Sequence, residues 1–250
     1  HEVAAANLRL AHFIVSMGED IYLKMLIQDN LMHADLHPGN ILIQTVEHSH
    51  DPKLQTNTEK EDGGDEESNK IVLVDAGMTA KLQYEERINF IGFLATIGEG
   101  NGTEAADFVL NFSPSSHYPD SLRISFREDM KRFFNQSCRG YHTGVDLGDV
   151  LRGILSLCRT HKVSVNSNYA TLIMNAMCLD GLAVSLLPSY NILDGAKMFL
   201  RFHRMCAKRG CLYLAKYFMP LARRIKGKTD RRFLKKELQL LEENVSMNKN

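Results

Sequence analysis

Two short runs of branched apolar residues, 41–44 and 70–74, constrain the fold more than any other feature of this chain. The first run reads Ile-Leu-Ile-Gln and follows Pro38-Gly39-Asn40, and the second reads Lys-Ile-Val-Leu-Val and ends at Asp75. Branched residues in short runs favour β-strands. We therefore expect a two-stranded hairpin that holds the preceding loop beside Asp75.

The remainder of the chain predicts helices. Apolar positions recur at three- and four-residue steps across 3–30, with Gly18 as a possible break, so two consecutive helices or one kinked helix lead into the loop. Beyond Met78 we expect helices separated by loops at 98–102, 113–120 and 140–148. The predicted fold class is α+β, predominantly α-helical, with one short two-stranded hairpin.

One stretch, 169–187, is apolar nearly all round and indicates a helix buried inside a helical lobe. Asn175 and Asp180 interrupt it, so it falls short of the roughly 18 apolar residues of a spanning helix, and we expect no membrane crossing. A further helical run covers 193–219, and Pro220 is expected to break the chain there.

The net charge is zero, but the charges are unevenly distributed. Between 45 and 69 there are eight acidic residues against two lysines and few large apolar side chains, which predicts a disordered insert between the strands. Between 223 and 236 there are eight basic residues against one aspartate. We divide the chain into one lobe, 1–222, containing the 45–69 insert, and a basic, charged C-terminal helix or tail, 223–250.

The basic stretch allows two interpretations. A solvated helix face is the simpler one, and peripheral contact of 223–236 with an anionic membrane is the alternative. We expect no nucleic-acid partner. The chain starts at His1 without a methionine and without a cleavable signal pattern, so it reads as a fragment of a longer protein.

Three polar residues around the expected hairpin carry the chemistry. Asp35 and Asn40 lie five positions apart before the first strand, and Asp75 follows the second. In kinase-type phosphoryl transfer, a loop aspartate positions the acceptor hydroxyl or water, and an asparagine five residues later binds a metal. The aspartate after the second strand holds Mg²⁺ between the nucleotide phosphates. We assign Asp35 a catalytic role and Asn40 and Asp75 cofactor and metal binding.

Two histidines of the same loop complete the catalytic set. His33 stands where the kinase loop carries its histidine, and we expect it to brace the loop. His37 stands where many protein kinases carry a lysine that contacts the transferring phosphate. It donates a hydrogen bond to that phosphate or is merely structural.

Metal chemistry offers a rival interpretation. His33, Asp35 and His37 alternate along the loop, and His48 and His50 follow. These residue types are zinc ligands, so a zinc hydrolase is the alternative. This alternative is weaker, because Pro38-Gly39-Asn40 has no part in it and the second histidine pair falls in the expected insert.

The string HADLHPGN at 33–40 resembles the aarF-domain (ABC1/UbiB) family of atypical kinases and also the loop of aminoglycoside and choline phosphotransferases. Asp75-Ala76-Gly77-Met78 separates the two, since it is similar to the aarF-domain pattern with Ala76 in the aromatic position. Further similarity lies at 82–87 and 179–192. The resemblance implies a kinase-like two-lobed fold, of which this chain would be the C-terminal lobe.

The same resemblance implies an atypical kinase or ATPase that uses ATP and Mg²⁺. Its partners would be a nucleotide and proteins of quinone biosynthesis or lipid metabolism, and its location the mitochondrial inner membrane. No glycine- or alanine-rich loop, strand lysine or Lys-x-Gly-Gln element precedes His33, so we expect little Mg-ATP binding by this chain alone. Two alternatives remain: a catalytically impaired scaffold that docks a lipid-biosynthesis complex, and a small-molecule phosphotransferase of the aminoglycoside or choline type.

Overall fold

The computed structural model describes residues 2–45, 69–113, 117–208 and 215–247. Its described helices are α1 (Glu2–Leu23), α2 (Tyr84–Glu99), α3 (Gly102–Leu110), α4 (Asp120–Ser137), α5 (Leu147–His161), α6 (Ser167–Leu186), α7 (Ile192–Lys208) and α8 (Ala215–Met247). A π-helical turn, Lys24–Asp29, follows α1, and a 3-10 turn, Pro38–Asn40, precedes the hairpin. The fold is therefore mostly helical, as predicted.

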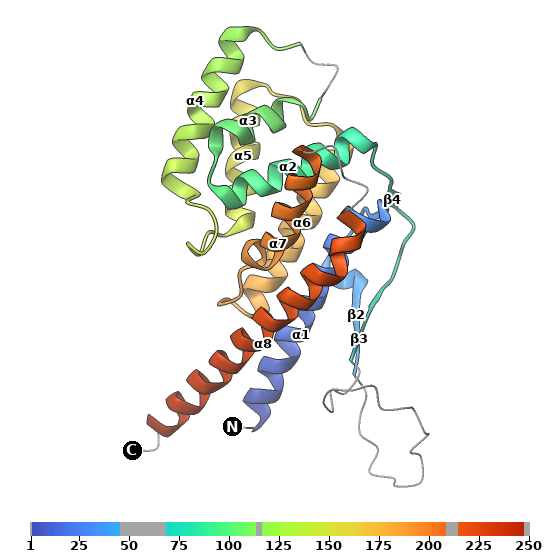
Figure 1. The fold of residues 1–250 in the computed structure, drawn as a ribbon, viewed down its shortest axis with the longest axis vertical. Coiled ribbons are helices and arrows are strands. Elements are labelled where there is room, and N and C mark those ends of the chain that lie inside the picture. The colour runs from blue at the N-terminus through green and yellow to red at the C-terminus, as the bar shows by residue number, and fades with distance from the viewer. Residues whose placement is uncertain (1, 46–68, 114–116, 209–214, 248–250) are drawn as a thin grey trace.

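The strands form two small antiparallel pairs. β2 (Ile41–Gln44) pairs with β3 (Lys70–Leu73) in the predicted hairpin, and β1 (Met32–His33) pairs with β4 (Thr79–Ala80) in a ladder that the sequence did not indicate. The hairpin projects beside α1 on the side away from α4 and α5 (Figure 1). The expected disorder of the insert concerns residues 46–68, which lie outside the described residues.

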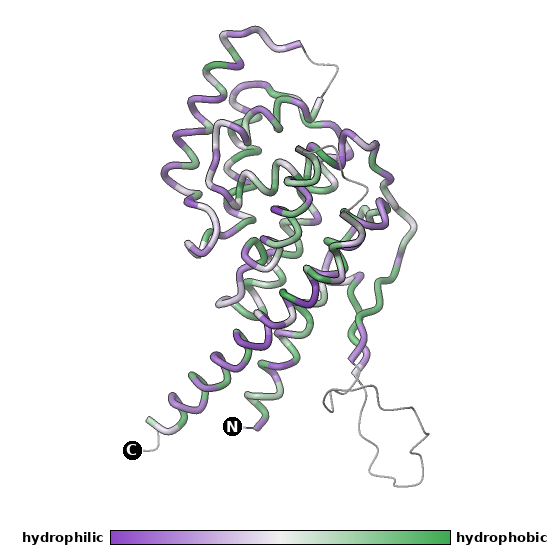
Figure 2. The backbone as a smooth tube through the Cα atoms, viewed as in Figure 1, coloured by the Kyte–Doolittle hydropathy of each residue, from purple (hydrophilic) through white to green (hydrophobic). Residues whose placement is uncertain are grey.

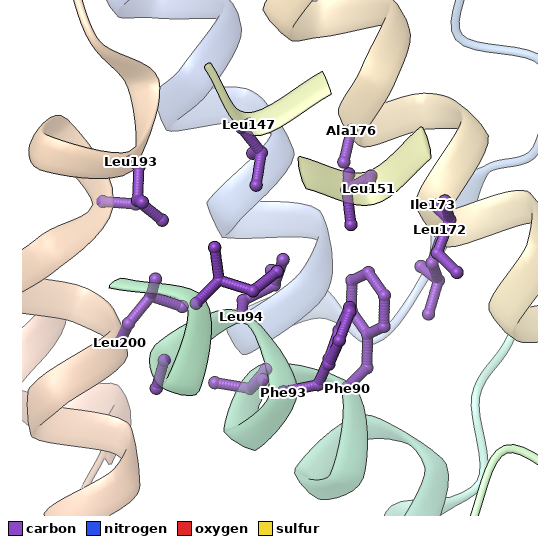
Figure 3. Close-up of a cluster of buried hydrophobic side chains, with 14 of the residues drawn as sticks. Phe90, Phe93, Leu94, Leu147, Leu151, Leu172, Ile173, Ala176, Leu193 and Leu200 are labelled. Carbon is purple, nitrogen blue, oxygen red and sulfur yellow. The ribbon is translucent and has the colours of Figure 1, made fainter. Parts of the chain in front are cut away.

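The core gathers around α2, in which every residue from 90 to 98 is buried. Its aromatic face meets α5, α6 and α7, as the cluster in Figure 3 shows. The labelled members are Phe90, Phe93, Leu94, Leu147, Leu151, Leu172, Ile173, Ala176, Leu193 and Leu200. Side chains of this kind each contribute roughly 1.5–3 kcal/mol when fully buried, so this cluster supplies a large share of the stability.

Helices α1 and α8 lie side by side and bring the two ends of the chain to the same end of the molecule (Figure 1). Gly18 does not break α1. A Cβ added there would lie 3.1 Å from Cδ1 of Leu179, so this glycine permits the close approach of α1 to α6. The α-helix ends instead at Leu23, and the π-helical turn begins at Lys24.

The expected break at Pro220 was wrong, because Pro220 lies inside α8, near its start. A proline there removes a backbone hydrogen bond close to a helix end, and the buried neighbours Met219 and Ala222 pack into the core and offset the loss. The described part of the 193–219 run is divided between α7, which is described to Lys208, and α8, which is described from Ala215.

Helix α6 is long and apolar enough to cross a membrane by length and composition, contrary to our expectation from the sequence. In this structure 44% of the apolar window is buried inside the lobe, and the helix carries Asn175 and Asp180 on its buried side. A core helix of a helical lobe passes the same test.

The hydropathy of the backbone tube alternates along α8 and becomes mostly hydrophilic toward its end (Figure 2).

Candidate active site

The 33–40 loop is tied at both ends to the segment that carries Asp75. The ladder of β1 and β4 closes the loop at His33, and the ladder of β2 and β3 closes it just after Asn40. The segment 74–78 joins β3 to β4, so it runs alongside the loop between the two ladders. The 33–40 loop, the two ladders and the segment 74–78 thus form one compact unit.

Val74 connects the two segments directly. Its backbone N–H donates to the carbonyl of Asn40 at 3.0 Å, and its carbonyl accepts from Nε2 of His33 at 3.0 Å. A further bond of 2.9 Å runs from the N–H of Ala34 to the carbonyl of Met78. The residues on both sides of 75–77 are therefore bonded to the loop, which brings Asp75 beside it.

His33 is buried, and both of its ring nitrogens contact the backbone. A carbonyl can only accept, so the bond to Val74 assigns the proton to Nε2, while Nδ1 accepts from the N–H of Asp35 at 3.2 Å. These two bonds hold the ring of His33 against the backbone, and its role in ordering the loop stays a prediction.

The same contacts weaken the zinc-hydrolase alternative. With Nε2 and Nδ1 of His33 both engaged by the backbone, the ring has no free nitrogen for a metal. Among the residues that the structure describes, no group of three or more His, Cys, Asp or Glu side chains is placed to hold a metal ion. His48 and His50 lie outside the described residues.

Asn40 is buried at the base of the loop, and its amide is oriented by one bond. Nδ2 donates to the carbonyl of Asp35 at 2.9 Å, which leaves Oδ1 as the side-chain atom able to meet a cation. Together with the exposed carboxylate of Asp75, this gives a set of hard oxygen donors, which fits Mg²⁺.

Asp75 adopts a left-handed backbone conformation, with φ of 57°. This region costs energy for residues with a Cβ, although aspartate tolerates it better than most, and it is found preferentially at functional sites. Asp75 follows the end of β3 at Leu73 and stands in the segment that leads to β4. A Cβ at Gly77 would lie 3.3 Å from Oδ1 of Asp75, which leaves little room for a side chain there.

Asp35 and His37 lie on the exposed rim of the loop. Nε2 of His37 is 3.6 Å from Oδ2 of Asp35, and Nδ1 of His37 accepts from the N–H of Gly39 at 3.1 Å. The bond to Gly39 caps the 3-10 turn and assigns the proton of a neutral ring to Nε2, on the side of Asp35. The contact is a structural cap, and it also directs a donor toward the carboxylate of Asp35.

Sequence reasoning missed Asn175 on α6. This side chain is 2% exposed, and it bonds the carbonyl of His33 and the N–H of Leu36 at the back of the loop. Burial, and after it the carboxylate of Asp35, raise the pKa of the Cys178 thiol, so the next turn of α6 also faces the loop. The signal in the sequence was a polar amide in the middle of an apolar helix, which we treated only as an interruption.

The described structure is a helical lobe whose short hairpin joins an Asp-x-x-x-x-Asn loop to a second aspartate, which is the arrangement expected from the resemblance to protein-kinase-like phosphotransferases. Residues 2–108 match the family model described as the ABC1 atypical kinase-like domain. That range contains the whole loop-and-hairpin unit. Over this part of its length the chain is therefore similar to ABC1/UbiB atypical kinases.

Curated relatives agree with that family at low identity. The chain is 26% identical to the "Probable serine/threonine-protein kinase abkC" of Dictyostelium discoideum over 233 residues, covering 75% of this chain and 34% of that protein. It is 25% identical to a mitochondrial ABC1 family protein of Schizosaccharomyces pombe, covering 75% and 30% of the two chains. It is 22% identical to the "Probable protein kinase UbiB" of Pasteurella multocida, covering 75% and 32%.

The chain spans about a third of the length of these relatives. No solved structure matches it.

Proposed function

We propose that the full-length protein is an atypical kinase or ATPase that binds Mg-ATP and transfers or hydrolyses its terminal phosphate. Asp35 positions the acceptor hydroxyl or water, and Asn40 and Asp75 would hold Mg²⁺, which would supply positive charge to the nucleotide phosphates. His33 orders the loop. His37 donates from Nε2 to the transferring phosphate, next to Asp35.

The observation that carries this proposal is the pair of hydrogen bonds made by Val74. They bond the segment before Asp75 to both the start and the end of the 33–40 loop, which supports a common site for the residues that we propose as catalytic and metal-binding. Groups held in this way need no reorganisation when charge develops on a transferring phosphate. Magnesium, when bound, neutralises the phosphates and orients them.

The test is phosphate release from Mg-ATP, or phosphotransfer, by the full-length protein and by its Asp35→Asn and Asp75→Asn variants. We expect each substitution to lower kcat at least about a hundredfold, because each removes a charge that acts in the transition state. Asp149→Asn on α5 is the matched control, since Asp149 is exposed, lies outside the proposed site and pairs with the exposed Arg152. Equal turnover by wild type and both site variants would favour the non-catalytic scaffold instead.

The biological setting that we propose is mitochondrial quinone or lipid metabolism at the inner membrane. Two relatives, from Schizosaccharomyces pombe and Saccharomyces cerevisiae, are named as mitochondrial ABC1 proteins, and others carry the name UbiB. We further propose a particular resemblance to aarF domain-containing protein kinase 2, on the basis of Ala76 in the aromatic position of the family pattern.

For the basic stretch 223–236 we propose peripheral contact with an anionic membrane. It lies on α8, where Lys226 is buried and the exposed cations are Arg224, Lys228, Arg231, Arg232, Lys235 and Lys236. Each cation near an anionic surface contributes about 1 kcal/mol at moderate salt.

We expect the protein to bind vesicles that contain anionic lipid and to be released by salt. Joint replacement of Arg231, Arg232, Lys235 and Lys236 by glutamine should weaken binding at least about tenfold. Vesicles of neutral phosphatidylcholine are the control. Binding that is absent, or unchanged by salt, would refute a membrane-surface role for this helix.

A further inference from the structure

We propose that Asn175 of α6 is a positioning residue for Asp35, acting through the backbone of the 33–40 loop. The inference rests on the proposed function for its kinetic consequence. Its structural content, that a core helix holds the loop in shape, stands on contacts of the described residues alone.

Asn175 binds the loop on both sides of Asp35. Its Nδ2 donates to the carbonyl of His33 at 2.5 Å, and its Oδ1 accepts from the N–H of Leu36 at 3.2 Å. These partners lie 142 and 139 residues away along the chain, so the bonds join the loop to a separate part of the fold. The peptide units that flank Ala34 and Asp35 are thereby fixed by one side chain.

Asn175 is itself held by the core. Its neighbours on the buried side of α6, Leu172, Ala176 and Leu179, are each no more than 3% exposed. Packing at this density leaves few alternative rotamers for a residue on the helix. The position of Asp35 is therefore fixed relative to the core of the lobe.

The other bonds around Asp35 are local. Its N–H donates to Nδ1 of His33, and its carbonyl accepts from Nδ2 of Asn40. Local bonds shape the loop, but they move with it when the whole loop shifts. The bonds from α6 limit such a shift, and a misplacement of about 1 Å in a catalytic group can lower the rate about a hundredfold.

The chemistry of this position requires one donor and one acceptor. The asparagine amide supplies both at fixed separation, whereas an ionised carboxylate supplies only acceptors. In an Asn175→Asp variant, the bond to Leu36 survives, but the carbonyl of His33 meets a donor only while the carboxyl group is protonated. A carboxyl group in this buried position protonates more readily than one in water, because burial disfavours its charged form.

The experiment is the pH profile of ATP turnover by the full-length protein and its Asn175→Asp variant. At about pH 8 we expect kcat to be lower in the variant by about tenfold to a hundredfold, with the KM for ATP changed much less. As the pH falls to about 5.5, the ratio of variant to wild-type kcat should rise toward one. The ratio is the quantity compared, because the ionisable groups near the loop, His33, Asp35, His37 and Cys178, are present in both proteins.

Asn191 offers a matched control. Its Nδ2 donates to the carbonyl of Val145 at 2.8 Å and its Oδ1 accepts from the N–H of Asp194 at 3.1 Å, the same bidentate pattern at the start of α7. An Asn191→Asp variant should lose stability, but the ratio of its kcat to the wild-type kcat should stay constant as the pH changes. A ratio for Asn175→Asp that is flat with pH, or that matches Asn191→Asp, overturns the inference.

A second measurement is independent of activity. In an Asn175→Leu variant, we expect amide hydrogen exchange at residues 33–37 to accelerate at least about tenfold more than exchange in α2. Equal acceleration in both places means general destabilisation and also overturns the inference. If wild type and Asp75→Asn turn over ATP equally, the proposed function fails, while the exchange experiment still decides whether α6 orders the loop.

Discussion

Replacement of Lys226 by methionine is expected to lower the free energy of unfolding by about 3–5 kcal/mol, the range found when one partner of a buried ion pair is removed. Lys226 lies on α8 with its side chain 2% exposed, and its ammonium group meets three carboxylates. It is 3.4 Å from Glu19, 3.0 Å from Asp20 and 3.3 Å from Asp230. These carboxylates outweigh burial in their effect on the ammonium group, so its pKa is raised.

The reason for so large an effect is that the substitution leaves the acids behind. Methionine fills most of the volume, but Glu19, Asp20 and Asp230 would then face one another without a cation. Lys226 also donates to the carbonyl and to Oγ of Ser16, each at 3.0 Å, and these bonds join α8 to α1. We therefore expect the loss to loosen the contact between the two terminal helices.

Chemical and thermal denaturation of the two proteins at pH 8 measures this effect. Lys228→Met is the matched control, because Lys228 is exposed two residues further along α8, and it should change stability by less than about 0.5 kcal/mol. A loss below about 1 kcal/mol for Lys226→Met would show that water reaches the carboxylates and that the cluster does not secure α8.

The second large effect concerns pH. Burial, opposed by the ammonium group of Lys226, raises the pKa of Glu19 from 4.5 to about 7. A raised pKa means that the folded protein holds this proton when the unfolded chain has lost it. The stabilisation is present in full below pH 4.5 and is lost as the pH rises through about 7.

We expect the difference in unfolding free energy between wild type and Glu19→Gln to change by about 2–3 kcal/mol between about pH 5 and pH 8. Glutamine is isosteric and still accepts from the hydroxyl of Tyr190, which lies 2.7 Å from Oε2. The wild type should lose stability across this range relative to the variant.

Denaturation at several pH values measures this difference. The comparison with the variant cancels the pH-dependent contributions of two other ionisable groups. Asp180, whose pKa burial raises to about 6, adds a slope of the same sign, whereas His203, whose pKa burial lowers to about 4, adds one of opposite sign. Both are present in each protein. Parallel stability curves for wild type and Glu19→Gln would contradict a neutral Glu19 near pH 6.

What the sequence predicted correctly was local. Strands 41–44 and 70–73 form where branched residues cluster, and the turn residues before and after them carry the candidate site. Their pairing required only a hairpin, which is the simplest connection of two adjacent strands. The ladder of β1 and β4 was missed because two residues in each strand are too few to leave a pattern.

What the sequence could not predict depends on distant parts of the chain. Nothing in the local pattern shows that Lys226 belongs to a buried ionic cluster, and we counted it among the charges of a basic stretch. Asn175 was likewise hidden, since its partners lie in a loop near the other end of the chain. Pro220 misled us because packing of its neighbours outweighs its local preference.

The hairpin has a consequence for insertions and deletions in related proteins. The pairs run from Ile41 opposite Leu73, next to the site, to Gln44 opposite Lys70, where the connecting segment attaches. Residues added beyond Gln44 leave these pairs unchanged, so homologues are free to differ in length there. The near end of the hairpin is different. One residue added or lost there, next to Asn40 or Val74, would turn the side chains of that strand to the opposite face. Length variation among related proteins in this region should therefore be confined to the far end of the hairpin.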